Sequence, residues 1–340
     1  MRKTFLMSGH TMPGALPRLS HICMMILLVF FFAACGGDDE PGDGTGGNTG
    51  GTEVNVNKNT TADGNTGVAT AIKRTEFPHV NATSNNYYVI VHSLSGAQNQ
   101  YTYASSKYTF DAEGVNFCVV WDKNRKSQLC TCYQMHRGYN GEYNRVMGLT
   151  YPQDPELPTQ YRLDRDYISG SGFQHGHICP NVDRTFSHDA NAQTNYMTNM
   201  QPQYAQFNGY DSKDNSHTGL WLKMENKVTG LAKNLASTDT LFICKGGTIQ
   251  DGQVLRTVNG MIVPKYFFMA VLKKSSTGYH AFGFWTEHLS SYVPSNVDMK
   301  QYAMSIDELE QLTGIDFFCN LPDDVENAVE KSFSPSYWGF

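Results

Sequence analysis

The chain has 340 residues, of which 40% are hydrophobic, and it carries 32 Asp and Glu against 26 Lys and Arg. This apolar content is sufficient for a folded core, so collagen-like, coiled-coil and wholly disordered proteins are excluded. The formal net charge of −6 argues against a protein that coats nucleic acid through a general basic surface, because nonspecific phosphate binding needs clustered Lys and Arg.

The first 34 residues have the composition of an export signal. They contain Arg2, Lys3 and Arg18 but no acid, and their apolar run over residues 22–34 is too short to span a bilayer. The string FAAC, which ends at Cys35, resembles a bacterial lipobox, in which Cys35 becomes the lipidated first residue of the mature protein. We therefore expect an exported outer-membrane lipoprotein, with an ordinary signal peptide or a short membrane anchor as the alternatives. The acids at 38–40 resemble the export tags of surface lipoproteins, which suggests exposure on the cell surface.

The segment after Cys35 predicts a flexible tether. Ten of the 32 residues in 36–67 are Gly, and Asn, Thr and Asp make up most of the rest. The expected organisation is a signal peptide over 1–34, a lipidated Cys and linker over 35–75, and one folded domain over 76–340. Residues 68–340 hold 22 Lys and Arg against 26 acids, so the folded body is only weakly acidic.

Six cysteines remain after Cys23 leaves with the signal and Cys35 is lipidated. An exported, even-numbered set permits up to three disulfides, whose connectivity the sequence leaves open. The paired C-x-x-C spacing of structural zinc sites is absent, so buried thiols or disulfides are expected. The six are Cys118, Cys130, Cys132, Cys179, Cys244 and Cys319.

The predicted elements alternate between strands and a few helices. A turn is expected at 122–125, a loop-rich stretch at 138–171 with three prolines, and an amphipathic helix over 220–235. Near the end, a capping box at Ser305 predicts a short helix that Gly314 can end. Strands are expected over residues 87–92, 116–121, 128–135, 241–244, 263–272 and 279–285. The pattern is α+β with an antiparallel core.

Residues with catalytic potential concentrate between 173 and 225. In the string FQHGHICP, His175 and His177 are two residues apart and would point to one side of a strand end. The string TNYMTNMQPQ follows at 194–203, and Asn208 comes five residues later. Asparagine oxygens are hard ligands suited to Mg²⁺, and a histidine suits proton abstraction from water. Together they indicate hydrolysis assisted by one metal ion.

This ordered set resembles the DNA/RNA non-specific endonucleases, the ββα-metal (His-Me finger) nucleases typified by the secreted Serratia nuclease. The family pattern is D-R-G-H, then T-N-x-x-x-N-x-x-P-Q, a metal-binding asparagine, and a helix that ends in L-E. It is matched here by 174–177, 194–203, Asn208 and 221–225, with further likenesses over residues 86–322. The resemblance implies an α+β fold in which helices flank a central antiparallel sheet. It also implies an endonuclease that cuts DNA and RNA irrespective of the sugar and leaves 5′-phosphate ends.

The resemblance assigns a role to each matched residue. His177 would be the general base, and Asn208 would hold Mg²⁺, for which Mn²⁺ could substitute. Glu225 would orient water around the metal, and Arg145 would contact the phosphate. Two asparagines, Asn195 and Asn199, would brace the site.

The chain departs from the family pattern at Gln174 and His175, which stand where Asp and Arg are usual. His175 and Arg184 are expected to contact the substrate, and the only other partner expected is the membrane that holds Cys35; no protein partner is inferred. Residues 211–218 also form an insertion before the helix that carries Glu225.

Other interpretations stay open from the residues alone. His177 could be a structural histidine, Asn208 a turn residue and Glu225 an exposed helix side chain. A zinc hydrolase could use His175 and His177, and a non-catalytic surface binding lipoprotein would explain the tether but not the asparagines. Preference for DNA or RNA, oligomeric state and biological role are not readable from the sequence.

Overall fold

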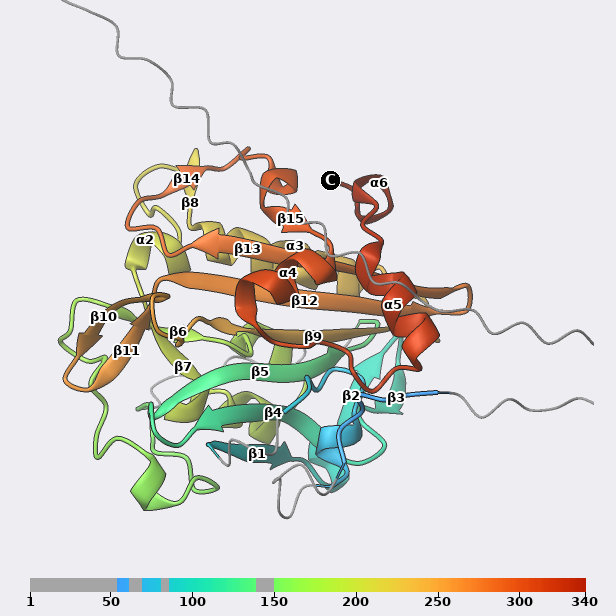
Figure 1. Cartoon of the computed structure of the whole chain (residues 1–340), viewed down its shortest axis with the longest axis horizontal. Coiled ribbons are helices and arrows are strands. Elements are labelled where there is room, and N and C mark those ends of the chain that lie inside the picture. Colours follow the sequence, from blue (N-terminus) through green and yellow to red (C-terminus); the bar gives the residue numbers. More distant parts are fainter. Residues whose placement is uncertain (1–53, 61–68, 81–85, 139–149) are drawn as a thin grey trace, which may run out of the picture. The chain divides into compact units, whose positions relative to one another are not determined.

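The computed structural model describes residues 54–60, 69–80, 86–138 and 150–340 (Figure 1). The predictions for the signal peptide, for Cys35 and for Arg145 therefore lie outside the described residues. Within the described ranges, no helix has both the length and the apolar character that crossing a membrane requires.

A seven-stranded sheet forms the centre of the folded body, and each neighbouring pair of strands in it is antiparallel (Figure 1). This architecture confirms the predicted α+β class with an antiparallel core. In spatial order the strands are β1 (Tyr87–Ser93), β4 (Val115–Asp122), β5 (Ser127–Met135), β9 (Thr240–Gly247), β12 (Tyr266–Ser275), β13 (Gly278–Glu287) and β15 (Ala303–Met304).

The strand predicted over 263–272 is wrong in one respect, because the structure divides it in two. β11 (Met261–Pro264) pairs with β10 (Val254–Val258) in a separate small sheet, and β12 begins at Tyr266. Pro264 has no N–H to donate to a ladder, and the backbone N–H of Lys265 donates to Gln253 O at 3.0 Å. The chain therefore changes sheets at this point.

Both faces of the sheet are buried, as the side chains of β4 illustrate. All eight residues of β4 are buried, which requires a covering layer on each side. Phe117 and Val119 pack in the core that includes Trp221 of α3 (Leu220–Lys233), whereas Cys118 and Val120 pack in a second core on the other face. The amphipathic helix predicted over 220–235 is confirmed.

Helices from different parts of the chain cover the two faces (Figure 1). The core with α3 also contains residues of α1 (His188–Gln193), α2 (Ala205–Asn208) and α6 (Pro335–Trp338). The other core contains residues of α4 (Ile306–Thr313) and α5 (Asp323–Lys331). The core that contains α1, α2 and α3 and the core that contains α4 and α5 are therefore separated by the sheet.

Helix α4 begins and ends as its sequence predicts. The Ser305 side chain accepts from the backbone N–H of Glu308, whose carboxylate accepts from the backbone N–H of Ser305. Gly314 ends the helix at φ 67°, in the left-handed region that glycine adopts without steric cost. The capping box is confirmed.

The remaining elements are short. The described part of the loop-rich stretch, 150–171, contains only the 3-10 helix η4 (Thr159–Tyr161), as its prolines predict. The paired strands are β2 (Gln100–Tyr103) with β3 (Ser106–Thr109), β6 (Gln174–His177) with β7 (Met200–Gln203), and β8 (His217–Thr218) with β14 (Val293–Pro294). The other 3-10 helices are η1 (Ala71–Lys73), η3 (Gly96–Asn99), η5 (Asn181–Arg184), η6 (Met197–Asn199) and η7 (Met299–Tyr302).

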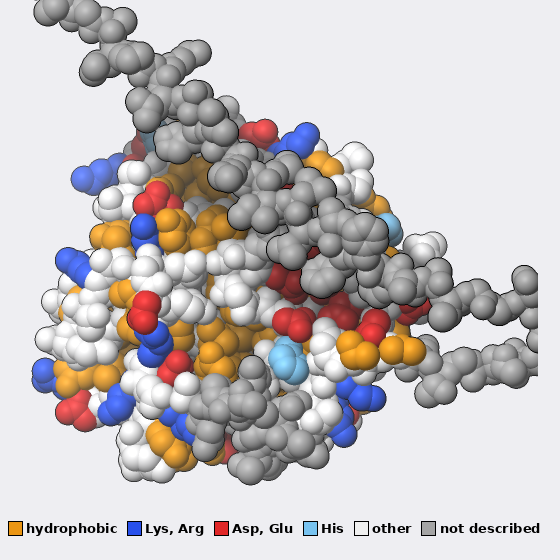
Figure 2. All heavy atoms as spheres, viewed as in Figure 1, with side chains coloured by type: hydrophobic (Ala, Val, Ile, Leu, Met, Phe, Trp, Pro, Cys, Tyr) orange, Lys and Arg blue, Asp and Glu red, His pale blue; other side chains and the backbone are white. Residues whose placement is uncertain are grey.

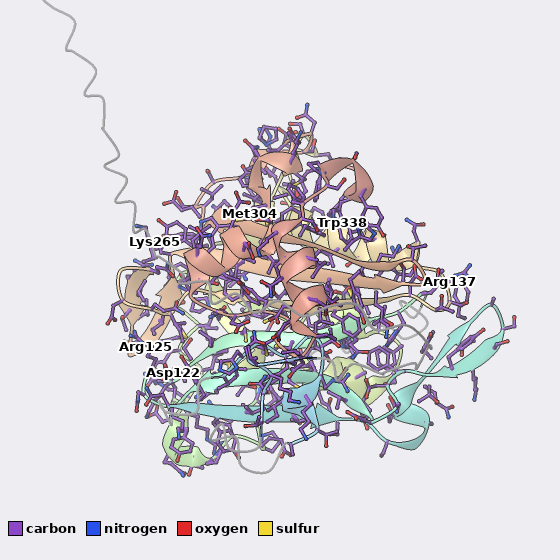
Figure 3. All side chains as sticks on the ribbon, turned by 45° about the vertical axis from the view of Figure 1, so that its right-hand side comes forward. Asp122, Arg125, Arg137, Lys265, Met304 and Trp338 are labelled. Atoms are coloured by element: carbon purple, nitrogen blue, oxygen red, sulfur yellow. The ribbon has the colours of Figure 1, made fainter. Side chains whose placement is uncertain are left out.

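The turn predicted at 122–125 joins β4 to β5. Asp122 Oδ1 accepts from the backbone N–H groups of Asn124 and Arg125 at 2.9 and 2.8 Å. Arg125 in turn donates to the carbonyl oxygen of Ile249 at 2.8 Å. Figure 3 shows Asp122 and Arg125 together at one end of the sheet. The turn thus ties the β4–β5 hairpin to the loop after β9.

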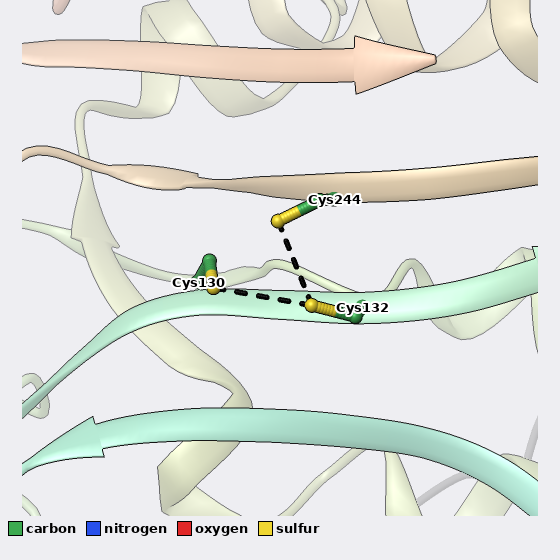
Figure 4. Close-up of side chains that lie close together, drawn as sticks. All are labelled: Cys130, Cys132 and Cys244. Carbon is green, nitrogen blue, oxygen red and sulfur yellow. Dashed lines mark hydrogen bonds between the residues drawn. The ribbon is translucent and has the colours of Figure 1, made fainter. Parts of the chain in front are cut away.

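All six cysteines of the folded body are buried free thiols, so the structure shows the thiol alternative and not disulfides. Three of them, Cys130, Cys132 and Cys244, meet on the face of the sheet opposite to α3 (Figure 4). The Sγ of Cys132 lies 3.9 Å from that of Cys130 and 3.5 Å from that of Cys244. Burial raises the pKa of the Cys132 and Cys244 thiols, which favours the neutral form.

The linker predicted over 35–75 is wrong at residues 54–60, which pack against the folded body. Asn55 Nδ2 donates to the carbonyl oxygens of Cys319 and Leu321 at 3.1 and 2.5 Å. Asn59 is 2% exposed, and it donates to Pro78 O and accepts from the backbone N–H of Val80. Asn55 thus pairs with backbone groups of the C-terminal region and Asn59 with those of residues 78 and 80, so residues 54–60 belong to the folded body.

Candidate active site

Strand β6, which pairs with β7, carries both His175 and His177. In their antiparallel register, His175 lies opposite Pro202 and His177 opposite Met200. Gly176 lies between them, where an added Cβ would come within 2.1 Å of Cδ of Gln203. Because Gln203 is fully buried, a side chain at position 176 would displace it. The H-G-H spacing thus allows the two strands to pack closely.

A hydrogen bond orients the His177 ring. Its Nε2 lies 3.3 Å from Oδ1 of Asn195, whose Nδ2 donates to the carbonyl oxygens of Asn191 and Ala192, each at 3.3 Å. With the amide NH₂ so engaged, Oδ1 is the acceptor and His177 Nε2 carries the hydrogen. In that tautomer the lone pair lies on Nδ1, the atom that can take a proton.

Asn199 supports the backbone just after His177. Its Nδ2 donates to the carbonyl oxygens of Cys179 and Thr194 at 3.0 and 2.8 Å, and its Oδ1 accepts from the backbone N–H of Cys179 at 2.7 Å. Asn199 is fully buried, so it acts on the chain and not on a ligand. It holds the segment after His177 against the segment that begins β7.

Asn208 ends the short helix α2, and its side chain is held by Gln174. Asn208 Nδ2 donates to Gln174 Oε1 at 3.0 Å. This bond occupies the amide nitrogen and leaves the amide oxygen as the group that can bind a cation. Gly219 closes the insertion after Asn208, since its N–H donates to Gly209 O at 2.7 Å. Helix α3 therefore starts beside α2 despite the inserted residues.

Glu225 forms a buried ion pair with a lysine from the central sheet. Lys245 Nζ in β9 lies 2.7 Å from Glu225 Oε1, and the side chains are 1% and 11% exposed. Lys245 Nζ also lies 4.9 Å from the centroid of the Trp221 ring. Burial raises the pKa of Glu225, and Lys245 opposes that rise. Glu225 is thus not a solvated side chain of an exposed helix face.

His175 is held by a carboxylate and an aromatic ring. Its Nε2 lies 2.8 Å from Asp166 Oδ2, and its ring stacks on Tyr151 with centroids 3.6 Å apart and an interplanar angle of 8°. Burial acts to raise the pKa of Asp166, but hydrogen bonds from Ser169 and His175 lower it below its ordinary value. Asp166 therefore stays ionised beside the His175 ring.

These side chains border one open cleft of about 730 Å³. His175, His177 and Asn208 lie along it together with Glu225. Tyr210 borders both this cleft and a neighbouring groove of about 740 Å³. A base, an amide oxygen and a carboxylate thus meet on the wall of one cleft, and Tyr210 lies between this cleft and the neighbouring groove.

The comparisons with known proteins agree with this geometry. Residues 92–324 match the family profile of the DNA/RNA non-specific endonucleases, which is more than half of the chain. The chain belongs to the DNA/RNA non-specific endonuclease family. It is therefore a metal-dependent endonuclease that hydrolyses phosphodiester bonds.

Individual relatives support the assignment of this endonuclease. A nuclease of Nostoc sp. (strain PCC 7120) is 31% identical over 223 residues, which cover 63% of this chain and 75% of the relative. Nuclease C1 of Cunninghamella echinulata var. echinulata is 26% identical over 179 residues, which cover 50% of this chain and 67% of the relative. In the solved EndoG/EndoGI complex, one chain superposes with a TM-score of 0.51 at 16% identity, covering 68% of this chain and 90% of its own. That likeness confirms the ββα-metal fold.

The structure corrects one expected substrate contact of this endonuclease. Arg184 is fully buried, and it donates to the carbonyl oxygens of Asp183, Asn116 and Gln134. Its guanidinium also lies 4.7 Å from the centroid of the Tyr133 ring. Arg184 therefore lies within the core and stabilises it through these contacts. A side chain so enclosed cannot reach a nucleic acid in the cleft.

Four residues of the endonuclease site were not given a role from the sequence. Gln174 was noted only as a departure from the family pattern, and Tyr151 and Asp166 lie in a loop-rich stretch without a motif. For Lys245 the sequence held one signal of a buried position. Lys245 follows Leu241 and Ile243 at alternate positions of β9, and those two residues face the core that contains α3. A lysine in that register has to find a buried partner.

The zinc-hydrolase alternative finds no support in the geometry. Among the described residues, neither His175 nor His177 belongs to a group of three His, Cys, Asp or Glu side chains spaced to hold a metal. His175 Nε2 is instead engaged by Asp166. A pair of imidazoles without a third ligand does not make a zinc site.

Proposed function

We propose that this endonuclease cuts DNA and RNA irrespective of the sugar, with Mg²⁺ as the preferred ion and Mn²⁺ able to substitute, and leaves 5′-phosphate ends. The observation that carries the proposal is the pair of oriented side chains on one cleft. Asn195 fixes the tautomer of His177, and Gln174 fixes the amide of Asn208. The two groups have the roles that hydrolysis of a phosphodiester needs, a base and an oxygen ligand.

His177 acts as the general base. Its Nδ1 takes a proton from a water molecule, and the water oxygen attacks phosphorus in line with the departing 3′ oxygen. The bond to the 3′ oxygen breaks, so the phosphate stays on the 5′ side. Asn195 Oδ1 accepts from Nε2 throughout and therefore stabilises the imidazolium that forms.

The residues present fit a hard divalent cation. Asn208 offers an amide oxygen and Glu225 a carboxylate at the same cleft, where no thiol lies among the lining residues. Asn208 would hold the ion, and Glu225 would accept hydrogen bonds from the water molecules around it. When bound, Mg²⁺ supplies charge stabilisation to the phosphate and to the leaving oxygen. Arg145 stays the predicted phosphate contact.

A plasmid assay tests the proposal. Supercoiled DNA and a single-stranded RNA are incubated with the protein in chelator, Mg²⁺, Mn²⁺ or Zn²⁺. We expect cutting of both substrates with Mg²⁺ and Mn²⁺, and ends that polynucleotide kinase labels only after phosphatase treatment. His177→Ala should abolish cutting while far-UV circular dichroism is unchanged, whereas His188→Ala on the exposed face of α1 should retain it. Cutting with Zn²⁺ alone would contradict the proposed ion.

We further propose that Cys35 is lipidated and anchors the enzyme in the outer membrane, where it acts on extracellular polymer. The support is the basic and apolar leader followed by FAAC, together with the Gly-rich tether. The test is fractionation of cells that express the native chain or Cys35→Ser. The variant should move from the membrane to the soluble fraction; a variant that stays on the membrane would refute the lipid anchor.

A further inference from the structure

Tyr210 is an exposed aromatic residue that follows Asn208 at the second position. It is 67% exposed, and it borders both the catalytic cleft of about 730 Å³ and the neighbouring groove of about 740 Å³. Asn226 of α3 also lines both hollows, so the cleft and the groove adjoin at these two residues. Tyr210 therefore lies where a nucleic acid strand would pass from the cleft into the groove.

The backbone of Tyr210 is held in place although its side chain is exposed. The hydroxyl group of Tyr292 donates to Tyr210 O at 2.9 Å, and Tyr210 forms an antiparallel β-bridge with Thr218. One residue earlier, Gly209 O accepts from the backbone N–H of Gly219 at 2.7 Å. A tyrosine has few rotatable bonds, so on an anchored backbone it loses little conformational freedom when a ligand stacks on its ring. Tyr210 thus offers a preorganised aromatic surface.

Two lysines of α3 line the groove beyond this tyrosine. Lys223 and Lys227 are four residues apart, so they are neighbours on one side of the helix. Lys223 Nζ donates to Ser295 O at 2.5 Å, and neither lysine takes part in an ion pair in the described part of the chain. Lys227 Nζ donates to Gly339 O at 2.9 Å. An ammonium group has three donors, so each lysine can still donate to a phosphate.

The acids near the groove do not pair with these two lysines. Asp211 is the single acid among the described residues that line the groove, and its Oδ1 accepts from the backbone N–H of Lys213 at 3.0 Å. Asp214 Oδ2 lies 2.8 Å from Nδ1 of His217. Figure 2 shows acidic side chains gathered over α4 and α5, whose core lies on the other face of the sheet from that of α3. The groove thus offers cations next to an aromatic surface, the combination that binds single strands.

We propose that Tyr210 stacks on an unpaired base of the substrate, and that Lys223 and Lys227 bind phosphates of the same strand in the groove. This inference rests on the proposed function, because it takes Asn208 as the group that holds the ion at the scissile phosphate. Every base has a π-face, so stacking adds affinity without reading the sequence, and the lysines contact only the backbone. A base inside a duplex already stacks on its neighbours. The site therefore binds a single strand of DNA or RNA more tightly than an intact duplex.

Binding to a short oligothymidylate tests the stacking. Affinity is measured by fluorescence anisotropy in Mg²⁺ with the full-length His177→Ala protein, which does not cut the probe. Adding Tyr210→Ala should weaken binding by about 5- to 150-fold, the range that follows from losing one base–aromatic stack. Tyr210→Phe keeps the ring and should bind as tightly as the parent. An abasic oligonucleotide of equal length should bind the parent more weakly, and Tyr210→Ala should reduce this difference between the two probes.

The salt dependence of the same binding tests the lysines. Replacing Lys223 and Lys227 together by Gln should reduce the slope of log affinity against log salt by about 1.4, because each phosphate contact on a single strand contributes about 0.7. Lys107→Gln with Lys274→Gln removes the same charge at exposed positions that do not line the groove, and should keep the full slope.

Further controls separate this inference from the proposed function. Tyr108→Ala removes an exposed tyrosine of β3 and should bind the probe as tightly as the parent. The binding measurements need no turnover, whereas the proposed function is refuted by a native chain that does not nick plasmid in Mg²⁺. Equal affinity of Tyr210→Ala and the parent for the single strand, or tighter binding of the parent to a duplex of the same length, would overturn the stacking. An unchanged salt slope in the lysine double variant would overturn the phosphate contacts.

Discussion

Polar side chains beside the cleft decide how the groups that border it are oriented. Gln174, Asn195 and Lys245 each contact one side chain that borders the cleft, respectively Asn208, His177 and Glu225. Such partners fix the tautomer, the amide orientation or the charge of the group that they contact. Two mutational predictions follow from these contacts.

Replacing Gln174 with Met should weaken metal binding more than it slows the reaction. The variant keeps a similar volume but removes the acceptor for Asn208 Nδ2, so the amide is free to rotate. The loss of such a partner costs about 10–100-fold in metal affinity or activity. We expect the Mg²⁺ concentration for half-maximal nicking to rise by about 10-fold or more. Gln206→Met on α2 is the control, and an unchanged Mg²⁺ requirement in Gln174→Met would refute the positioning role.

Replacing Lys245 with Met should change both stability and the pH profile. A carboxylate left buried without its partner destabilises a protein by about 3–5 kcal/mol. Lys245 lowers the pKa of Glu225, so its removal raises that pKa further, and the acid limb of the nicking profile should move to higher pH. Adding Glu225→Gln should recover part of the lost stability. An unmoved acid limb would show that Glu225 is not needed in its ionised form.

At the scale of elements, the pairing of β6 with β7 places the base. The two strands belong to different motifs of the sequence, 174–177 and 194–203. In their antiparallel pairing, His177 nevertheless lies directly opposite Met200. Their close approach depends on Gly176, because the Gln203 side chain lies across it. A small change in this pair would displace His177 from the cleft.

Gly176→Ala should therefore slow nicking without unfolding the protein. The new Cβ would lie 2.1 Å from Gln203 Cδ, so one strand has to shift, and a misplacement of about 1 Å can cost about 100-fold in rate. We expect a fall of at least about 10-fold, measured as initial nicking rate at saturating Mg²⁺. Adding Gln203→Ala should restore part of the rate. Gly230→Ala in α3, where an added Cβ meets nothing within 4 Å, should leave the rate unchanged.

At the scale of the whole folded body, chain segments from its two ends close the second face of the sheet. Residues 54–60 hydrogen-bond to the region before α5 and to its first residue, more than 250 positions later in the sequence. Each of these contacts joins a side chain to a backbone group, so it satisfies a backbone donor or acceptor that no strand or helix supplies. Stability should therefore depend on a segment that is remote from the catalytic cleft.

Asn59→Ala should destabilise the protein without altering catalysis. The change leaves Pro78 O and the backbone N–H of Val80 without their partner in a buried position, which costs about 1–3 kcal/mol each. We expect a lower midpoint in urea unfolding and an unchanged nicking rate at a temperature where the variant is folded. Lys58→Ala, at an exposed neighbour, is the control. Equal midpoints for Asn59→Ala and the native chain would mean that this segment does not contribute to global stability.

The sequence by itself determined the parts that depend on local pattern and on ordered motifs. Hydrophobic periodicity located most strands of the central sheet and helix α3, and the capping box located α4. The series of His177, the asparagines and Asn208 identified the family, because its chemistry depends on residue type at set spacing. These features depend on residues that are close together in the sequence, so they can be predicted without knowing how the elements pack.

Only the tertiary structure decided which distant side chains meet. It paired Glu225 with Lys245, placed Asp166 beside His175, buried Arg184 in the core, and brought Asn57 to Glu326. Each of these contacts joins segments whose separation in sequence carries no periodic signal. Whether a charged side chain faces solvent or a buried partner depends on the elements that pack over it, and that packing is set by the whole core.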